Sequence, residues 1–568
     1  MDHLYFVAHT HWDREWYQPF QQMRARLVAM ADKMIPLVES GAVPSFHFDG
    51  QTVVLEDYLA VRPEMAPRLK RLIGAGQVQV GPWFVLADSF LVSGESLIRN
   101  LEIGMSIARR FGKPLDVGYL PDQFGHTAQL PQILAGFGFR TAVLWRGVPA
   151  AIVRNRFVWE ALDGSSVLTV YLPHGYGNGS VLALKSVESF LKRVGDIASR
   201  ERPYADGAPI LIMVGTDHTE PDPRLKERLG EARGAEGFSF EIGPLETYVK
   251  RLAELPPNGI VHHRGELRSP RRAHLLPGVT SARTWIKQRD FRNCGALERI
   301  ADPLAALANF SGAPQSFENQ LELAWRFELE NHPHDSICGC SVDQVHEDMR
   351  YRFDQAALIA EDVAQRAVGA IFERAPDGEP AIAVFNPTFA TRALVTANVE
   401  LPDSSASYAI ETGDGRRIPA AFEVATAEKP MEIDLAASEF KGWVGQLSGA
   451  SVMGRAVNAY ELRQSAGGRF QLDLFTSRTA IGAPPDIEAF RARVRAEIAD
   501  DATVKVRMVS ASRATVSFAA DGLTRAGFSY FRVVRDQVSE RTSAEPSSNS
   551  IENEFYRLRA NGRGLEVT

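Results

Sequence analysis

Short apolar runs alternate with helix-like stretches over about the first 255 residues of the chain. The runs favour β-structure, and almost every one ends in a polar or glycine-rich cluster; they lie at residues 4–7, 78–80, 117–120, 141–144, 167–170 and 209–214. Strands that alternate with helices predict a mainly parallel sheet or barrel. Because the polar clusters follow the strand ends, we expect them to share one mouth of a barrel-like domain.

Helix-like patterns replace this alternation between about residues 260 and 375. Residues 296–310 and 317–330 each predict a helix, and residues 342–375 predict one long helix or two. Within the last stretch, apolar residues recur at the three-to-four spacing of a bundle helix. From residue 381 onward, short β-favouring runs with frequent turn signals predict sandwich strands.

Length and composition bound the kind of protein. With 568 residues, 45% hydrophobic and 23% charged, the chain has the composition of a globular protein of roughly three or four domains. A net charge of −7 argues against nucleic acid as the main partner. No apolar run approaches the roughly eighteen residues that span a bilayer, so we expect no membrane partner either.

Three cysteines, Cys294, Cys338 and Cys340, are too few for a disulfide framework and fit a reducing compartment. Cys338 and Cys340 lie two residues apart and could form a thiolate metal site, although no second cysteine pair follows at finger-like spacing. The N-terminus lacks a basic segment followed by an apolar core, so no signal peptide is predicted. We therefore expect a cytoplasmic protein.

The cluster that follows the first predicted strand carries the strongest chemical signal. Residues 7–16 read Val-Ala-His-Thr-His-Trp-Asp-Arg-Glu-Trp. Residues two apart on an extended backbone point the same way, so His11 and Asp13 can direct an imidazole and a carboxylate to one point. Such a pair is suited to binding a metal ion. The alternative is a strand end whose polar residues face solvent.

Three later clusters have matching chemistry. Asp122 follows a strand within Pro-Asp-Gln-Phe-Gly-His, Asp217 lies within Gly-Thr-Asp-His after another strand, and His334 lies beside Asp335 in the helical region. Two imidazoles and two carboxylates make a sound zinc site. Its predicted ligands are His11, Asp13, Asp122 and His334. Asp217, outside the metal shell, could act as acid and base.

Each cluster also has a simpler interpretation. Asp122 before a glycine turn could be a helix cap, and Asp217 and His218 could be ordinary polar groups of a loop. A solvated helix face could account for His332, His334 and His346. Spacing alone does not bring the distant clusters together, so the residues by themselves support an α/β enzyme, a metal-dependent hydrolase, and no more.

A series of ordered segments carries a resemblance to a known family. They include His-Thr-His-Trp-Asp at 9–13 followed by Trp16, and the segments 49–52, 81–83, 93–100, 121–126, 215–218, 264–268, 281–283 and 334–339. In these segments the chain resembles the α-mannosidases of glycoside hydrolase family 38, in particular the bacterial type. So many motifs in the same order make chance similarity a poor explanation.

The resemblance implies a reaction and its residues. It implies a zinc-dependent retaining α-mannosidase, with one Zn²⁺ per chain, that removes terminal α-linked mannose by double displacement. Asp122 would be a zinc ligand and also the nucleophile, and Asp217 would be the general acid/base. The residues that resemble the lining of the sugar subsite are Trp16, Phe124, Arg146 and Asp335.

The resemblance also implies a multidomain architecture of α/β, α and β parts. Residues 1–258 would form a seven-stranded (β/α) barrel-like catalytic domain, and residues 259–376 a three-helix bundle that contributes a zinc ligand. Residues 377–568 would form an incomplete C-terminal β-sandwich region. Family members usually run well beyond this length, so we expect the chain to be C-terminally truncated.

Two other functions stay open. A zinc-dependent carbohydrate deacetylase would use similar ligands to activate water against an amide, and a truncated chain could bind mannose without turning it over. The expected partner is a mannose-containing oligosaccharide or a small α-mannoside, of unspecified linkage and aglycone. A homo-oligomer is compatible with the sequence, and the site could accept cobalt or manganese in place of zinc.

Overall fold

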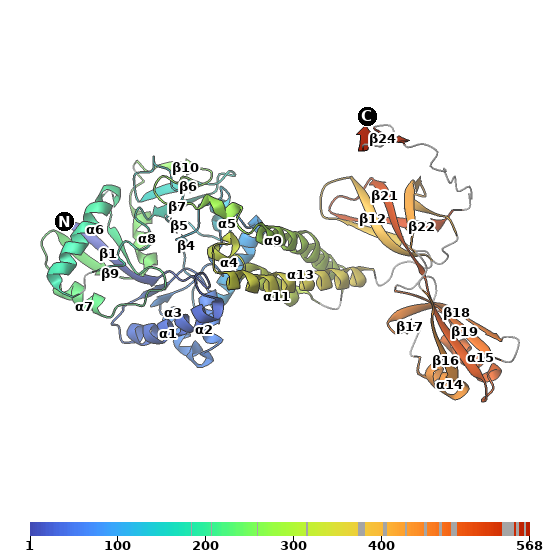
Figure 1. Ribbon diagram of the computed structural model, residues 1–568. Coiled ribbons are helices and arrows are strands. Elements are labelled where there is room, and N and C mark those ends of the chain that lie inside the picture. The colour runs from blue at the N-terminus through green and yellow to red at the C-terminus, as the bar shows by residue number, and fades with distance from the viewer. Residues whose placement is uncertain are drawn as a thin grey trace. The chain divides into compact units, whose positions relative to one another are not determined.

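The computed structural model describes most of the chain. The described residues are 1–182, 185–205, 207–257, 259–313, 316–372, 381–401, 406–425, 429–447, 451–464, 469–478, 485–536, 550–552, 556–561 and 564–568. They divide between two compact units, Met1–Glu373 and Arg374–Thr568 (Figure 1).

The first unit is built on a five-stranded parallel sheet around β1. The order is β3 (Val78–Gln79), β2 (Phe46–Phe48), β1 (Asp2–Thr10) and β8 (Ile210–Val214), and β9 (Phe238–Ile242) also pairs with β1. Every pairing in this sheet is parallel, as the alternation of strands and helices predicts. The carboxyl ends of β1, β2 and β8 therefore lie at the same edge.

A second five-stranded sheet holds the remaining strands of this unit. Its order is β10 (His262–Arg264), β6 (Arg156–Glu160), β7 (Ser166–Tyr171), β5 (Thr141–Leu144) and β4 (Gly118–Leu120). β4, β5 and β7 run parallel to one another and β10 is parallel to β6, whereas β6 runs antiparallel to β7. The connection at 161–165 is too short for a parallel crossover, so these two strands form a hairpin.

Alternate residues of β1 face two different cores, as the period of an extended strand requires. Leu4 and Phe6 pack with β8 and with α6 (Val187–Ala205) and α7 (Arg224–Glu231). Tyr5 and Val7 pack with residues of β4, β5 and β7 and with α8 (Leu245–Glu254). The two sheets thus share an interior. In the described residues of the first unit, strand pairing gives two sheets. A closed seven-stranded barrel stays a prediction.

Five more helices complete the sheet-containing part of the first unit. They are α1 (Phe20–Glu39), α2 (Val53–Leu59), α3 (Ala66–Gly74), α4 (Gly94–Phe111) and α5 (Leu130–Gly136). Leu101 of α4 and Leu134 of α5 pack in one core with Leu144 of β5 and Trp159 of β6. The second sheet is therefore covered by helices on the side away from the shared interior.

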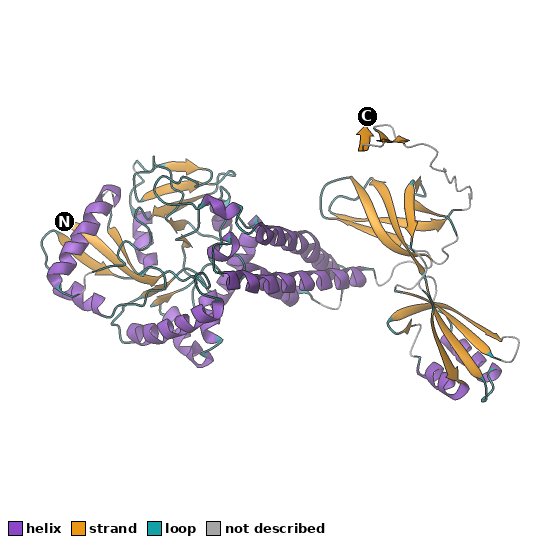
Figure 2. Ribbon diagram, viewed as in Figure 1, coloured by secondary structure: helices purple, strands orange, loops and turns teal. Residues whose placement is uncertain are grey.

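Long helices follow in sequence and pack along α13 (Asp343–Ile371) (Figure 1, Figure 2). α9 (Thr284–Ala296) runs through a π-helical turn, Leu297–Ala301, into α10 (Asp302–Phe310), and α11 (Glu318–Leu329) and the short α12 (His334–Cys338) come next. The helices predicted at 296–310 and 317–330 are confirmed, and the stretch from 342 forms one helix. A three-helix bundle as a separate domain stays a prediction, because these helices belong to the same compact unit as the sheets.

Two sheets of the second unit share one core, as sandwich strands do. One has the order β11 (Ala381–Asn386), β22 (Gly527–Arg535), β13 (Tyr408–Thr412) and β14 (Arg417–Ile418). The other has the order β12 (Arg392–Leu401), β21 (Ser512–Asp521) and β15 (Ala420–Val424). Ile410 and Phe531 of the first sheet meet Val516 and Phe518 of the second.

A third sheet of the second unit carries two helices that the sequence pattern did not predict. Its order is β16 (Met431–Ala436), β20 (Thr503–Ser510), β19 (Phe470–Ser477), β18 (Arg455–Gln464) and β17 (Ser451–Val452). α14 (Ala437–Gln446) and α15 (Ile487–Glu497) share a core with this sheet. Since β19 and β20 are parallel, their connection must cross over, and α15 lies in it. β23 (Ser550–Glu552), β24 (Arg557–Asn561) and β25 (Gly564–Val567) form a small sheet.

The division into three domains stays a prediction, because Asn258 and Pro376, at the expected boundaries, lie outside the described residues. No helix in the described part of the chain combines the length and apolar character needed to cross a membrane.

Candidate metal centre at the strand ends

Three strand ends in the first unit carry predicted chemical groups to one place. His11 follows β1 directly and forms a β-bridge with Asp217, which follows β8, while Asp122 follows β4. Gly215 lets β1 and β8 approach this closely, because a Cβ there would collide with the carbonyl oxygen of His9. The polar ends of β1, β4 and β8 therefore lie close together, and one shared mouth of a barrel-like domain stays a prediction.

His334 joins the group from the helical region. It is the first residue of α12, and its backbone N–H donates to the carbonyl oxygen of Leu86. Two side chains tie this region to the loop after β1. Ser336 Oγ donates to Glu15 Oε1 at 2.8 Å, and Arg352 Nη2 of α13 donates to the same oxygen at 2.6 Å. Glu15 is fully buried, so this junction has little freedom to shift.

The four predicted ligands, hereafter the strand-end cluster, form a ring of short distances. His11 Nε2 lies 3.2 Å from Asp13 Oδ1, which lies 3.4 Å from His334 Nε2. His334 Nε2 lies 3.5 Å from Asp122 Oδ2, which lies 3.9 Å from His11 Nε2. Nitrogen and oxygen ligands at about 2.0–2.1 Å around a tetrahedral zinc ion are separated by roughly 3.3 Å. The ring therefore has about the size that one such ion needs.

The atoms that face the middle of the strand-end cluster lack hydrogen bonds. His11 Nε2, Asp13 Oδ1 and His334 Nε2 are buried, and none of them has a hydrogen-bond partner within the described structure. Buried polar atoms are seldom left in this state. Two overlapping groups of possible ligands are His11–Asp122–His334 and Asp13–His334–Asp335. Within each group, the ligand atoms lie within 4.8 Å of one another. Their imidazoles and carboxylates fit a divalent cation.

The other nitrogen of each imidazole is held from outside. His11 Nδ1 lies 3.0 Å from Asp49 Oδ2, and His334 Nδ1 lies 3.2 Å from the carbonyl oxygen of Leu86. Both partners accept hydrogen bonds, so each ring donates from Nδ1 and turns Nε2 toward the centre, where it could bind an ion. Asp49 is fixed in turn by the backbone N–H of Trp12, which donates at 2.7 Å.

Asp122 is held at both carboxylate oxygens. Oδ2 faces the two imidazoles, and Oδ1 accepts hydrogen bonds from Arg146 Nε at 2.9 Å and Nη2 at 2.6 Å. Burial alone would raise the pKa of Asp122. The close approach of the His334 imidazole, together with the charge of Arg146, outweighs burial and holds that pKa below its ordinary value. Asp122 is thus an oriented and ionised carboxylate.

Asp217 is held by Tyr176, a residue that the sequence pattern did not single out. The Tyr176 hydroxyl donates to Asp217 Oδ1 at 2.8 Å, and the ring packs on the imidazole of His11 with centroids 4.8 Å apart. Burial and the charges of Asp122 and Asp217 raise the pKa of Tyr176, so the hydroxyl keeps its proton. Tyr176 lies in a glycine-rich loop without periodicity, which is why sequence reasoning missed it.

The four predicted sugar-contacting residues occupy different positions. The Phe124 ring lies 5.5 Å from the His334 ring, and Asp335 Oδ2 lies 3.9 Å from His334 Nε2, so both residues border the strand-end cluster. Arg146 binds Asp122 and sits 5.4 Å from the Phe124 ring centroid. Trp16 is half-buried on the loop after β1 and packs edge-on against Tyr17. Contact of these residues with a sugar stays a prediction.

Negative charge dominates the strand-end cluster. Burial lowers the pKa of an imidazole, but the nearby carboxylates, Asp335 and Asp122 foremost, outweigh burial and raise the pKa of His334 to about 10. Burial and the charge of Asp13 in turn raise the pKa of Asp335. Such shifts arise where buried carboxylates crowd together, and a bound cation would relieve them.

Two simpler interpretations are wrong. Asp122 caps no helix, because the next helix, α5, begins only at Leu130. The proposed solvated face does not exist, since His332, His334 and His346 are 0%, 3% and 1% exposed. Among the described residues, the groups with metal-ligand spacing include Cys294 but neither Cys338 nor Cys340, so the idea of a thiolate pair at 338 and 340 gains no support.

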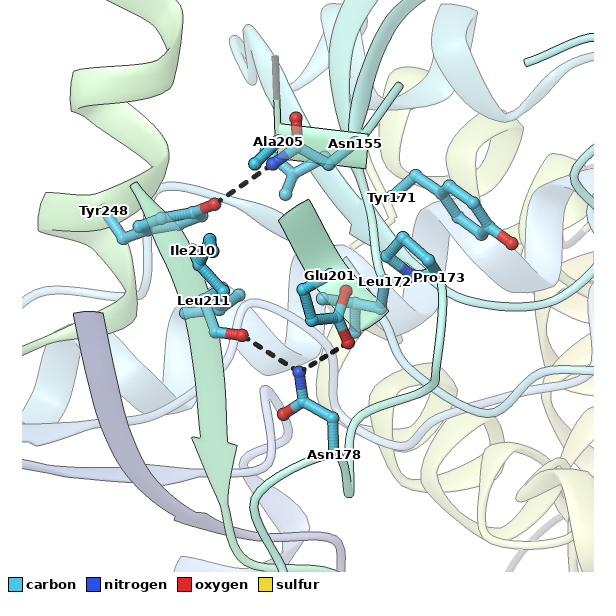
Figure 3. Close-up of a pocket in the computed structure, with 11 residues that line it drawn as sticks. Asn155, Tyr171, Leu172, Pro173, Asn178, Glu201, Ala205, Ile210, Leu211 and Tyr248 are labelled. Carbon is cyan, nitrogen blue, oxygen red and sulfur yellow. Dashed lines mark hydrogen bonds between the residues drawn. The ribbon is translucent and has the colours of Figure 1, made fainter. Parts of the chain in front are cut away.

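A small cavity lies elsewhere in the first unit, lined by residues of β7, β8, α6 and α8 (Figure 3). Its volume is about 20 Å³, which is room for roughly one water molecule. Asn178 Nδ2 donates to Glu201 Oε1 and to the carbonyl oxygen of Leu211, both at 2.9 Å. The cavity is too small for a sugar and contains no member of the strand-end cluster.

Comparison with known proteins agrees with this geometry. Residues 1–263 match the model of the glycosyl hydrolases family 38 N-terminal domain. This match covers slightly less than half of the chain, and it assigns residues 1–263 as a domain similar to those of glycosyl hydrolase family 38.

Similar proteins include a Halalkalibacterium halodurans protein named "Putative mannosylglycerate hydrolase", 35% identical over 62% of this chain and 41% of its own length. The Homo sapiens protein "Alpha-mannosidase 2C1" is 27% identical over 66% of this chain and 36% of its own length. The crystal structure of an α-mannosidase from Enterococcus faecalis superposes with a TM-score of 0.76 at 25% identity, over 100% of this chain and 60% of that one. The chain spans less than half the length of these two curated relatives.

Proposed function

We propose that the chain is a zinc-dependent retaining α-mannosidase that hydrolyses terminal α-linked mannose. The strand-end cluster carries the proposal, because its four ligands come from three distant parts of the sequence and three of them turn buried, unpaired atoms toward one point. Asp217 lies next to it, bonded to a tyrosine that also touches His11. The match of residues 1–263 to the family 38 N-terminal domain and the names of the similar proteins support the same reaction.

In this proposal Asp122 is the nucleophile. A carboxylate that attacks an anomeric carbon must be ionised and aimed, and the contacts with Arg146 and His334 favour both conditions. Asp217 gives a proton to the leaving oxygen in the first step and takes one from water in the second. A retaining enzyme holds two such carboxyl groups roughly 5–5.5 Å apart.

His11, Asp13, Asp122 and His334 would hold one Zn²⁺ per chain. When bound, the ion would supply a Lewis-acid contact for the sugar's vicinal hydroxyls. Mannose suits this arrangement because its axial 2-hydroxyl lies beside its 3-hydroxyl. Phe124 and Trp16 would offer apolar faces to the pyranose ring, and Arg146 and Asp335 would offer polar contacts.

The substrate in this proposal is a mannose-containing oligosaccharide or a small α-mannoside. The name of the Halalkalibacterium relative favours mannosylglycerate as one substrate to assay. We also propose a cytoplasmic location, supported by three free cysteines among the described residues.

The direct test is hydrolysis of an aryl α-mannoside by the 568-residue chain after chelation and again with zinc restored. We expect turnover to disappear with the metal and to return with it, whereas Asp196→Asn, an exposed carboxylate on α6, behaves as wild type. A folded, zinc-loaded chain without activity on aryl mannosides, mannosylglycerate or mannose oligosaccharides would contradict the proposal.

Covalent trapping separates the proposal from a deacetylase. A fluorinated mannosyl donor with a good leaving group should label the peptide that contains Asp122, because the first displacement leaves the sugar bonded to its carboxylate. A deacetylase activates water and forms no such bond. Labelling of any other residue, or none in an active enzyme, would refute the nucleophile assignment.

A further inference from the structure

A second group of metal-ligating side chains lies among the helices, apart from the strand-end cluster. Its members, hereafter the helical cluster, are Asp290, Cys294, Glu328 and His332. Asp290 and Cys294 are four residues apart on α9, so they share one face of that helix. Glu328 on α11 and His332 just beyond its end have the same spacing. Facing helices supply metal ligands in this manner in helical cores, and α9 packs against α11.

The distances within the helical cluster suit one ion. All four ligand atoms lie within 4.8 Å of one another. Cys294 Sγ is 3.7 Å from Asp290 Oδ1, and His332 Nε2 is 3.8 Å from Glu328 Oε1. Tetrahedral zinc with sulfur at about 2.3 Å and oxygen or nitrogen at about 2.0–2.1 Å gives edges of roughly 3.3–3.6 Å. The 2.7 Å edge from Asp290 to His332 is that of a hydrogen bond and must lengthen by about half an ångström.

The helical cluster is closed to solvent and incompletely paired. Its four residues are 0–5% exposed. Asn293 Nδ2 donates to Glu328 Oε2 at 2.8 Å and to the carbonyl oxygen of Phe353, which fixes the carboxylate from outside. The other oxygen, Glu328 Oε1, is buried without a hydrogen-bond partner in the described structure, as is His332 Nδ1. A fixed carboxylate with one free buried oxygen beside a thiol and an imidazole is what a ligand-binding position requires.

The charges within the helical cluster do not balance. In the described residues the ion pairs of Asp290 and of Glu328 are both with the same imidazole, that of His332. Two buried carboxylates therefore share one potential cation, and an uncompensated buried charge is costly. A divalent ion would balance both carboxylates at once, with the Cys294 thiol giving up its proton to solvent on binding.

We propose that Asp290, Cys294, Glu328 and His332 form a second, structural site for a divalent transition-metal ion, with zinc as the best fit. A thiolate and an imidazole favour zinc over the hard ions magnesium and calcium, and four protein ligands leave no open position. The site joins α9 to the end of α11 and to the segment that leads into His334. Its role is to hold these helices together, and it takes no part in the reaction proposed above.

Cobalt substitution tests the second site without any change to the chain. The strand-end cluster has only nitrogen and oxygen donors, so a thiolate-to-cobalt charge-transfer band in the near ultraviolet must come from a cysteine ligand. We expect wild-type protein loaded with Co²⁺ to show this band. Cys294→Ser should abolish it, while Cys340→Ser, whose sulfur lies beside Asp335, should keep it. Absence of the band, or its loss in Cys340→Ser alone, overturns the proposal.

Metal stoichiometry gives the second readout. The full chain, washed free of loose metal, should hold about two equivalents of zinc, and Cys294→Ser and Glu328→Gln should each hold about one and melt at a lower temperature. Zinc should raise the melting temperature of wild type more than that of either variant. If both variants bind as much zinc as wild type, then the helical cluster is a hydrogen-bonded network without an ion. The same conclusion follows if wild type binds only one equivalent of zinc and Glu328→Gln also binds one. The aryl-mannoside assay is scored separately, so failure here leaves the proposed function standing.

Discussion

His332 and His334 are separated by one residue, yet they belong to two different buried clusters. His334 faces Asp13 and Asp122 in the strand-end cluster, while His332 faces Asp290 and Glu328 in the helical cluster. Pro333 lies between them and starts α12 as its cap residue. Two histidines one residue apart thus belong to two separate clusters. The sequence around each histidine does not show which cluster it joins.

The two clusters differ in their access and in their neighbours. The Asp122 side chain in the strand-end cluster is 13% exposed, and that of Arg146, which binds it, is 12% exposed. The side chains in the helical cluster are buried, and Glu328 among them is held by Asn293, which also donates to the carbonyl oxygen of Phe353. A reaction needs a position that a substrate can reach, and a structural metal site needs the opposite. The two proposals therefore assign a reaction to the strand-end cluster and a stabilising role to the helical cluster.

Asp122→Asn should give the largest effect and bear on the strand-end cluster alone. Loss of the nucleophile, and of the charge at one zinc ligand, should lower kcat on an aryl α-mannoside on the order of 10⁴-fold or more. The cobalt charge-transfer band assigned to Cys294 should persist in this variant. Residual kcat within tenfold of wild type would show that Asp122 is not the nucleophile, and loss of the band would show that the two clusters are not independent.

Asp49→Asn and Asn293→Ala form a matched pair, because each changes an outer residue that orients one ligand. Asp49→Asn removes the charge that fixes the His11 ring, so the Kd for the activity-restoring zinc should rise about 10–100-fold. Asn293→Ala should leave that Kd unchanged and lower the melting temperature of the zinc-loaded protein. Titration of apoenzyme with buffered zinc, read by activity and by thermal unfolding, measures both. If the two variants change the Kd for zinc and the melting temperature by equal amounts, then both measurements report one shared site.

Tyr176→Phe should have the smallest effect. It removes one hydrogen bond to Asp217 and keeps the ring that packs on His11. A hydrogen bond to a charged group is worth about 1.5–3 kcal/mol, so kcat should fall about tenfold or somewhat more, with zinc content unchanged. A kcat equal to that of wild type would remove Tyr176 from any role in orienting Asp217.

Much of the fold followed from local pattern. The runs at 4–7, 141–144 and 209–214 are strands, and the stretch from 342 is a helix, because apolar periodicity reports burial directly. The hairpin of β6 and β7, the two helices α14 and α15, and the split into two five-stranded sheets were not predicted. Short amphipathic helices inside a β-rich region give a weak signal, and strand order depends on contacts that no local window contains.

The site divides in the same way. The sequence by itself determined which groups were available: His11 and Asp13 on one strand end, Asp122 and Asp217 on two others, and a histidine pair around Pro333. The tertiary structure alone decided that His11, Asp122 and His334 meet, that Tyr176 bonds Asp217, and that Cys294 joins His332 rather than its fellow cysteines. The physical reason is that strand and helix periods fix the directions of neighbouring side chains, whereas the packing of whole sheets and helices fixes which distant side chains share a buried point.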